Sequence, residues 1–287
     1  MEFKLLKVAQ SNLLIFFLVN TIFTSCSSPV ASIQNDIDRF KFEFPNHILK
    51  YKGKNRQMGL AWSGNPQKRP LLFVHGSPGS WQGWSHFLVD TQLQKDFHIL
   101  AVDRPGYGES GEGNAEFSVK AQAEDIALAL QFNQSHLPAV LIGHSYGGAV
   151  IARLAMDFPN LVGGLIFVSS SVSPELEKKK WFQYPASWWP FRLLIPTSLR
   201  VCNEEIEPLK KELTAMLPLW KNINSPVIMI QGEDDTLVSP ENINFLSRQL
   251  NPSLVIEIVR VPGLNHFVPW KRPDLISTAI IKVQNVL

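Results

Sequence analysis

The chain has little of several features that would place a protein in a special class. Its 287 residues contain only two cysteines, Cys26 and Cys202, so a framework of several disulfides cannot hold the fold together. Charge of neither sign dominates, and the net charge of +2 is far too balanced to indicate nucleic acid as a partner. A P-loop, a dinucleotide fingerprint, a zinc-ligand cluster and an EF-hand are all absent from the sequence, so we expect neither a cofactor nor a metal.

The N-terminal apolar stretch, Leu13 to Phe23, is short for a membrane-spanning helix, so a permanent transmembrane anchor is the weaker interpretation. It has roughly half the length that such a helix needs. Lys4 and Lys7 precede it, and small polar residues follow it from Thr24 to Ser28, which is the layout of a secretory signal. We therefore expect residues 1–26 to be a signal peptide and the protein to be exported.

Cys26 ends a segment, Ile22-Phe23-Thr24-Ser25-Cys26, that resembles a bacterial lipoprotein signal. In such signals the cysteine is lipidated and becomes the first residue of the mature protein. Phe23 departs from the pattern, because leucine is usual three residues before the cysteine. We favour lipidation of Cys26 and hence a bacterial membrane-anchored lipoprotein. The alternatives are a secreted or periplasmic protein, or one with an uncleaved anchor, in which Cys26 is an incidental thiol.

The remaining composition is that of one large globular domain, with 45% hydrophobic and 18% charged residues. We interpret residues 27–45, which are polar at first, as a tether, and residues 46–287 as the folded domain. Short apolar runs that end in turns indicate parallel strands buried on both faces, and segments of helical periodicity between them indicate crossover helices. The pattern therefore predicts an α/β fold with a doubly wound, mostly parallel sheet.

The expected elements can be given by residue range. Strands are predicted at residues 70–74, 98–102, 139–142, 165–168, 227–231 and 254–261, with weaker edge-strand signals around 47–62, and helices at 120–132, 149–158 and 273–286. No strong strand signal occurs between Ser171 and Pro226, where aromatic residues gather. We predict a helical insertion there, a lid over about residues 172–225.

The strongest motif is Gly143-His144-Ser145-Tyr146-Gly147, a G-x-S-x-G sequence between a predicted strand and a predicted helix. Its glycines are needed because a sharp strand-to-helix turn holds the serine in a strained conformation, and side chains at the flanking positions would collide. The motif predicts that the Ser145 hydroxyl is presented outward as a nucleophile.

With this motif, the span from about residue 45 to 287 resembles the α/β-hydrolase superfamily, in its serine-nucleophile esterase and lipase branch. The resemblance implies a triad in the chain order serine, acid, histidine. The acid is expected after the strand that follows the lid, where Asp235 stands at the usual position and Asp234 is its rival. The histidine is expected after the last strand, where His266 fits.

The chemistry requires a base and a binding site for negative charge. A serine hydroxyl is a poor nucleophile at neutral pH, so a neutral imidazole, His266, must take its proton while Asp235 stabilises the imidazolium that forms. The loop His75-Gly76-Ser77-Pro78-Gly79 resembles the oxyanion loop of this superfamily. By that resemblance, the backbone N–H groups of Ser77 and Tyr146 bind the negative oxygen of the intermediate.

The residue at the turn also bears on the subclass. Haloalkane dehalogenases and epoxide hydrolases carry aspartate where this chain has Ser145, so the resemblance implies acyl transfer to water. We interpret the related segment Asp103 to Ser110 as a structural loop near the site. Trp81, Trp84 and the lid residue Trp188 are candidate substrate contacts, with packing in the core as the alternative for each.

The combined interpretation is a serine hydrolase that cleaves a carboxylic ester of a small or medium apolar acyl substrate. Hydrolysis of an amide or a carbon–carbon bond stays open. One alternative is an aminopeptidase related to proline iminopeptidases, for which Glu204, Glu205 and Glu207 in the lid could bind the substrate amine. Another is a non-catalytic binding lipoprotein that has kept the fold, since a fold by itself does not establish activity.

Overall fold

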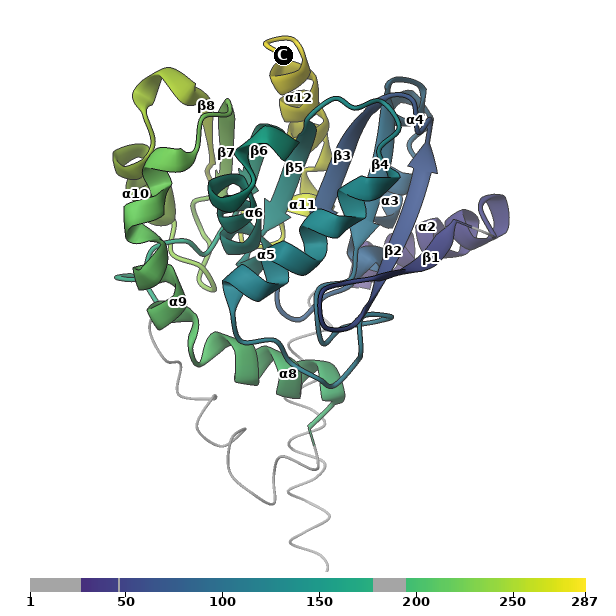
Figure 1. Ribbon diagram of the computed structural model, residues 1–287, viewed down its shortest axis with the longest axis horizontal. Coiled ribbons are helices and arrows are strands. Elements are labelled where there is room, and N and C mark those ends of the chain that lie inside the picture. The colour runs from purple at the N-terminus through teal and green to yellow at the C-terminus, as the bar shows by residue number, and fades with distance from the viewer. Residues whose placement is uncertain (1–26, 46, 178–194) are drawn as a thin grey trace, which may run out of the picture.

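The computed structural model describes residues 27–45, 47–177 and 195–287, which form one eight-stranded sheet with helices on both faces (Figure 1). The strand order is β1-β2-β4-β3-β5-β6-β7-β8. β1 and β2 join the sheet in the antiparallel direction, and all other pairs are parallel. The strands are β1 (Ile48–Lys52), β2 (Gln57–Gly64), β3 (Arg69–Val74), β4 (Phe97–Val102), β5 (Ala139–His144), β6 (Val162–Val168), β7 (Val227–Gly232) and β8 (Val255–Val261). The predicted fold class is confirmed.

Helices enclose a hydrophobic core on each face of the sheet. They are α2 (Ser27–Glu43), α3 (Ser85–Leu88), α4 (Thr91–Asp96), α5 (Val119–Ala127), α6 (Tyr146–Asp157), α8 (Thr197–Ile206), α9 (Leu209–Met216), α10 (Asn242–Gln249), α11 (Val268–Lys271) and α12 (Pro273–Gln284). In β3, Leu72 and Val74 join the core under α5, α6 and α9, whereas Leu71 and Phe73 join the core under α2, α3 and α12. Successive side chains of a strand point to opposite faces, so an uninterrupted apolar run fills both cores.

The stretch predicted as a tether differs from the structure, because Ser27–Glu43 form helix α2. Ile37 and Phe40 lie on one side of this helix and are buried, and the ring of Phe40 contacts those of Phe44 and Trp81. Side chains three or four residues apart share one face of a helix, so a few apolar residues suffice to attach a mostly polar segment. The folded domain therefore begins N-terminal to the predicted boundary.

The helical insertion between β6 and β7 contains α8, α9 and a 3-10 turn at Leu217–Asn222 in its described part. In Figure 1, α8 lies below the carboxyl ends of the central strands. A helical insertion was expected here, whereas its action as a lid stays a prediction. Residues 178–194, and Trp188 with them, lie outside the described residues.

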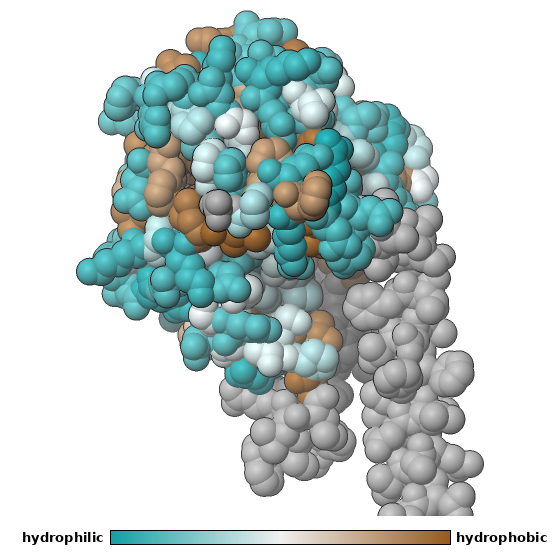
Figure 2. Space-filling view, turned by 90° about the vertical axis from the view of Figure 1, so that its right-hand side faces the viewer, coloured by the Kyte–Doolittle hydropathy of each residue, from teal (hydrophilic) through white to brown (hydrophobic). Residues whose placement is uncertain are grey.

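Within residues 27–45, 47–177 and 195–287, no helix combines the length and apolar character that crossing a membrane requires. The side of the molecule at the right of Figure 1 has a mostly hydrophilic surface, with apolar groups gathered near its centre (Figure 2). The predicted signal peptide and Cys26 fall on residues 1–26, outside the described residues. Export and lipidation therefore stay predictions.

Candidate active site

Ser145 lies at the turn between β5 and α6 in a strained conformation, with φ of 55° and ψ of −123°. Glycine at position 143 permits this turn, because a Cβ there would lie 2.6 Å from the carbonyl oxygen of Gly147. The N–H of Ser145 donates to the carbonyl of Val168, which ties the turn to the end of β6. The G-x-S-x-G motif thus forms the sharp strand-to-helix turn that the sequence predicted.

Asp235 follows β7 and receives a hydrogen bond of 2.7 Å from Nδ1 of His266 to its Oδ2 atom. Its Oδ1 atom accepts from the N–H groups of Leu237 and Val238 at 2.9 and 2.8 Å. Burial raises the pKa of Asp235, but the hydrogen bond and charge of His266 outweigh burial and hold it below its usual value. The neighbouring Asp234 is exposed. The structure thus places Asp235, rather than Asp234, against the histidine.

His144, the residue before Ser145, holds His266 next to the turn at Ser145. The two imidazole rings lie 4.6 Å apart, and Nε2 of His144 donates to the carbonyl of His266 at 3.0 Å. Burial lowers the pKa of His144 to about 3, so its ring is neutral and can serve as a fixed support. The Ser145 hydroxyl has no hydrogen-bond partner among the described residues. In enzymes without bound substrate, the hydrogen bond between a catalytic hydroxyl and its base is often long, and it shortens when substrate binds.

The backbone N–H groups of Ser77 and Tyr146 are the predicted donors to an oxyanion. Gly76 lies against Ser145, since a Cβ at position 76 would come within 2.8 Å of the Ser145 Cβ. The next N–H, of Ser77, and that of Tyr146, the first residue of α6, both lack a hydrogen-bond partner in the part of the chain that the structure describes. The N-terminus of a helix favours negative charge, so this arrangement suits an oxyanion.

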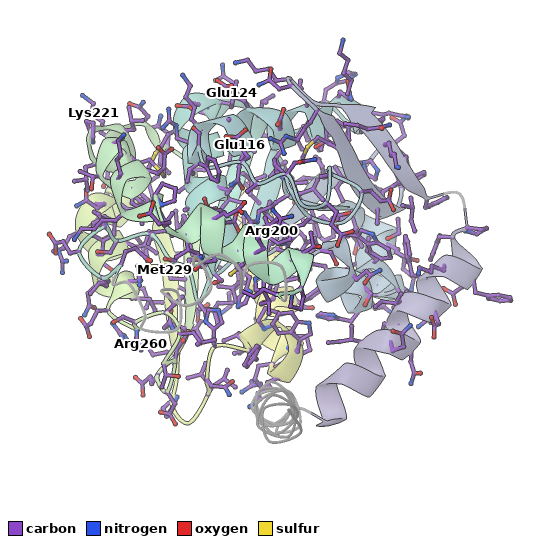
Figure 3. The ribbon with its side chains drawn as sticks, turned by 90° about the horizontal axis from the view of Figure 1, so that it is seen from below. Glu116, Glu124, Arg200, Lys221, Met229 and Arg260 are labelled. Carbon is purple, nitrogen blue, oxygen red and sulfur yellow. The ribbon has the colours of Figure 1, made fainter. Side chains whose placement is uncertain are left out.

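Arg104 and Glu205 form a buried ion pair that the sequence did not predict. Their side chains are fully buried, and two hydrogen bonds of 2.8 Å join them across 101 residues of sequence. Glu205 lies on α8, the helix marked by the label of Arg200 in Figure 3. Because Arg104 neutralises it, Glu205 is not placed to bind a substrate amine, which corrects one of the three acids predicted for the aminopeptidase alternative. The sequence drew attention to each residue separately but gave no signal for their pairing, because a pair this distant leaves no local pattern.

Trp81 and Trp84, predicted as possible substrate contacts, are packing residues in this structure. Both are buried in the core cluster beside α2 and α3. Trp81 packs on Phe40, and Trp84 packs on Phe73 with ring centroids 5.1 Å apart. Aromatic side chains bury large apolar areas, which explains why both tryptophans join the core.

Asp103 has the structural role that was predicted for its loop. Its two carboxylate oxygens accept from the N–H groups of Trp81 and Glu109 at 2.8 and 2.9 Å. Burial raises the pKa of Asp103 to about 6. The carboxylate therefore fixes the start of the turn at Trp81 and the loop at Glu109, and it takes no part in the candidate triad.

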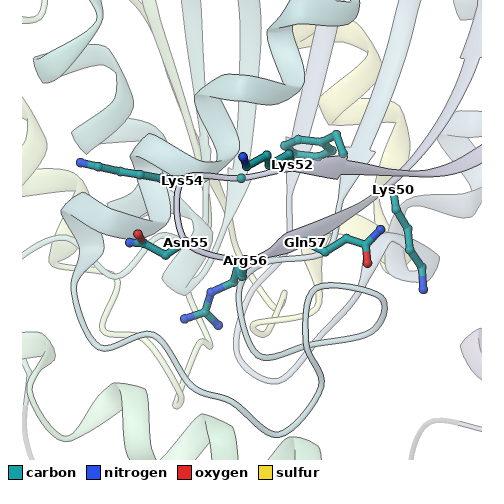
Figure 4. Close-up of a pocket in the computed structure, with 8 residues that line it drawn as sticks. Lys50, Lys52, Lys54, Asn55, Arg56 and Gln57 are labelled. Atoms are coloured by element: carbon teal, nitrogen blue, oxygen red, sulfur yellow. The ribbon is translucent and has the colours of Figure 1, made fainter.

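A pocket of about 300 Å³ adjoins the candidate triad. It is lined by Leu176, Glu177 and the segment Asp235 to Pro240. A hollow of about 470 Å³ lies instead at the β1–β2 hairpin, between Lys50 and Gln57 (Figure 4), and shares no residue with the candidate active site. Two of its lysines pair with acids, Lys50 with Glu109 and Lys54 with Glu124. The described residues bring no three His, Cys, Asp or Glu side chains together as metal ligands.

Comparison with known proteins identifies the family. Residues 71–279 match the alpha/beta hydrolase family, and the chain belongs to it. A 2-(acetamidomethylene)succinate hydrolase of Mesorhizobium japonicum is 24% identical over 73% of this chain and 86% of its own. Among solved structures, a thermophilic esterase of Thermogutta terrifontis has a TM-score of 0.62 at 18% identity, over 83% of this chain and 98% of its own. An epoxide hydrolase of Vigna radiata has a TM-score of 0.65 at 16% identity, over 84% and 98%.

These similarities support a hydrolase and leave the type of bond open. Identities of 16–18% to the solved structures show the fold alone. An esterase and an epoxide hydrolase both share it, because function in this fold resides in the site and not in the sheet.

Proposed function

We propose that the protein is a serine hydrolase that cleaves a carboxylic ester through an acyl-enzyme intermediate. The observation that carries the proposal is the strained turn that presents Ser145, with the carboxylate-bound His266 supported on the same turn through His144. A serine at this position favours acyl transfer, because its hydroxyl can form an ester with the substrate acyl group that water then cleaves.

In the proposed reaction His266 moves protons while Asp235 keeps its ring oriented. Nε2 of His266 takes the proton of the Ser145 hydroxyl as its oxygen bonds to the substrate carbonyl carbon. The N–H groups of Ser77 and Tyr146 bind the carbonyl oxygen, which becomes negative. The bond to the leaving alcohol then breaks, and the alcohol takes the proton from His266. Water repeats these steps on the acyl-serine, and the free acid leaves.

The pocket of about 300 Å³ beside Asp235 does not define the acyl site, because neither Ser145 nor His266 lines it. The size of the acyl group is therefore left to the ester series below. Lipidation of Cys26, if the sequence prediction holds, would place this activity at a membrane.

The proposal is tested by hydrolysis of p-nitrophenyl esters of increasing acyl length. Wild-type protein should turn over the esters with an optimum in chain length, and a fluorophosphonate should label it covalently. Ser145→Ala should lower kcat by at least about 10⁴-fold and abolish labelling, because no other group can form the acyl ester. Ser253→Ala, at an exposed turn, is the matched control and should behave as wild type.

Other outcomes have distinct meanings. Normal turnover by Ser145→Ala would rule out this nucleophile. Labelling without ester turnover would favour a peptidase or another acyl chemistry. Wild-type protein that neither reacts with fluorophosphonate nor hydrolyses any ester would support the binding lipoprotein instead.

A further inference from the structure

The buried pair of Arg104 and Glu205 joins the helical insertion to the oxyanion loop. Arg104 follows β4, and Glu205 belongs to α8. Both side chains are 0% exposed, and the two hydrogen bonds between them are parallel and 2.8 Å long. Removing two charges from water opposes folding, so a buried ion pair of this kind adds little to the free energy of unfolding. The other contacts of Arg104 and Glu205 indicate a different role.

The guanidinium of Arg104 holds the peptide unit that carries one proposed oxyanion donor. Its Nη2 atom donates to the carbonyl of Gly76 at 2.9 Å, and its Nε atom donates to the carbonyl of His75 at 2.9 Å. Nδ1 of His75 donates to the same Gly76 carbonyl at 2.7 Å. The Gly76 carbonyl and the N–H of Ser77 belong to one planar unit and point in opposite directions. Fixing the carbonyl therefore aims the Ser77 N–H.

The hydrogen bond from Arg104 to the Gly76 carbonyl also makes the Ser77 N–H a stronger donor. A hydrogen bond from a charged group to a carbonyl is shorter and stronger than a neutral one. It polarises the whole peptide unit, so that the N–H on the opposite side becomes a better donor. The charge of Arg104 thus acts on the oxyanion through the Gly76–Ser77 peptide, without touching the substrate.

The same pair reaches the second proposed donor. The Arg104 guanidinium lies over the ring of Tyr146 at 4.4 Å from its centroid, as a cation–π contact. On the other side, the Tyr107 hydroxyl donates to Glu205 at 2.6 Å and accepts a hydrogen bond from the Ser77 hydroxyl at 2.9 Å. Glu205 and Arg104 are therefore linked to both residues whose N–H groups form the hole.

We propose that Arg104 is a positioning residue for the oxyanion hole and that Glu205, on α8, holds Arg104 in place. The inference rests on the proposed function. It means that the insertion completes the catalytic site as well as covering part of the molecule. Without the Glu205 carboxylate, Arg104 loses its partner and the Ser77 N–H loses its fixed direction, so substrate still binds but the transition state is poorly stabilised.

The test compares kcat with KM in three variants of the full-length protein. Glu205→Gln keeps the shape of the side chain and removes its charge. The double variant Arg104→Met with Glu205→Leu replaces the pair by apolar groups of similar volume, which proteins often tolerate without loss of stability. Glu204→Gln, one residue away on α8 and paired with Arg200, is the matched control. Active sites are titrated with fluorophosphonate so that each kcat refers to folded protein.

We expect kcat for p-nitrophenyl acetate to fall about 10- to 100-fold in the first two variants, less than when a donor is deleted outright. KM should change by less than about threefold, because the ground-state contacts remain. If Glu205→Gln does not fold, the double variant decides. A pair with a merely structural role would give wild-type kcat in a stable double variant, and that result overturns the inference.

The inference is also overturned if Glu204→Gln lowers kcat to the same extent, or if the variants change KM and leave kcat as in wild type. Wild-type protein without ester turnover contradicts the proposed function itself. Because wild type is measured first, the two failures are distinguishable.

Discussion

The backbone at Ser145 holds a conformation that costs a residue other than glycine about 1–3 kcal/mol. Three hydrogen bonds hold it there: its N–H donates to Val168, and its carbonyl accepts from Gly148 and Ser171. At His266 the fixed element is the ring, bonded through Nδ1 to Asp235. At the residue scale, the candidate site thus consists of groups whose conformations are set by their neighbours, which is what a pre-organised catalytic site requires.

Replacing Asp235 by asparagine should lower kcat by about 10⁴-fold while the protein stays folded. The amide removes the negative charge that stabilises the imidazolium, and it presents a donor where His266 also donates. The matched control is Asp234→Asn, one residue earlier and exposed, which should keep wild-type turnover. Ester hydrolysis with circular dichroism as the check on folding measures both. If the losses were reversed, Asp234 would be the acid.

Helix α2 shows how little apolar surface is needed to attach an element to a domain. Its composition is mostly polar, and among its side chains described from residue 33 onwards, Ile37 and Phe40 are buried in the core. Phe40 is fully buried between Phe44 and Trp81, whereas Phe42, two residues later, is 87% exposed. At the element scale, the contribution of α2 to stability should therefore depend on one face of the helix.

Phe40→Ala should reduce the free energy of unfolding by about 3–5 kcal/mol, because it removes a buried ring and leaves a cavity against Trp81. Phe42→Ala is the matched control on the same helix and should change stability by less than about 0.5 kcal/mol. Urea unfolding followed by tryptophan fluorescence measures both. Equal small effects would mean that α2 does not dock in solution.

Four histidines whose pKa values are lowered make the folded protein sensitive to acid. Burial lowers the pKa of His86 and His98 to about 4 and that of His144 to about 3, and it holds the pKa of His75 well below the usual range. Their ordinary value is 6.5, so the unfolded chain binds more protons than the folded protein below that pH. Stability is therefore complete above pH 6.5 and falls as the pH drops. Asp103, with a pKa raised to about 6, acts in the opposite direction, as do Asp36 and Asp125, whose pKa values burial also raises.

His98→Phe should make the folded protein less sensitive to acid. The Nδ1 atom of His98 is buried without a hydrogen-bond partner among the described residues, and its ring meets Trp62 edge to face, a contact that phenylalanine keeps. Between pH 7 and 5, wild type should lose about 2 kcal/mol more than the variant in free energy of unfolding. Chemical denaturation at several pH values gives the difference. Parallel pH curves would show that His98 titrates normally in the folded state.

Much of this protein was decided locally and could be predicted from its sequence. Apolar runs such as residues 139–142 became strands buried on both faces, because a continuous run serves both cores. The turn at Ser145 was predictable because its glycines are required by backbone contacts a few residues away. The placement of Asp235 and His266 followed from resemblance to a family, not from any local physical signal.

What only the tertiary structure decided involves residues far apart in sequence. A polar segment became the docked helix α2, and Trp81 became its packing partner. Glu205, one of three neighbouring acids on the insertion, became the partner of Arg104 from 101 residues away. Periodicity and motifs reflect contacts between residues that are close together in the sequence. Whether a charged side chain can be buried depends instead on which residue, distant in the sequence, the fold places beside it.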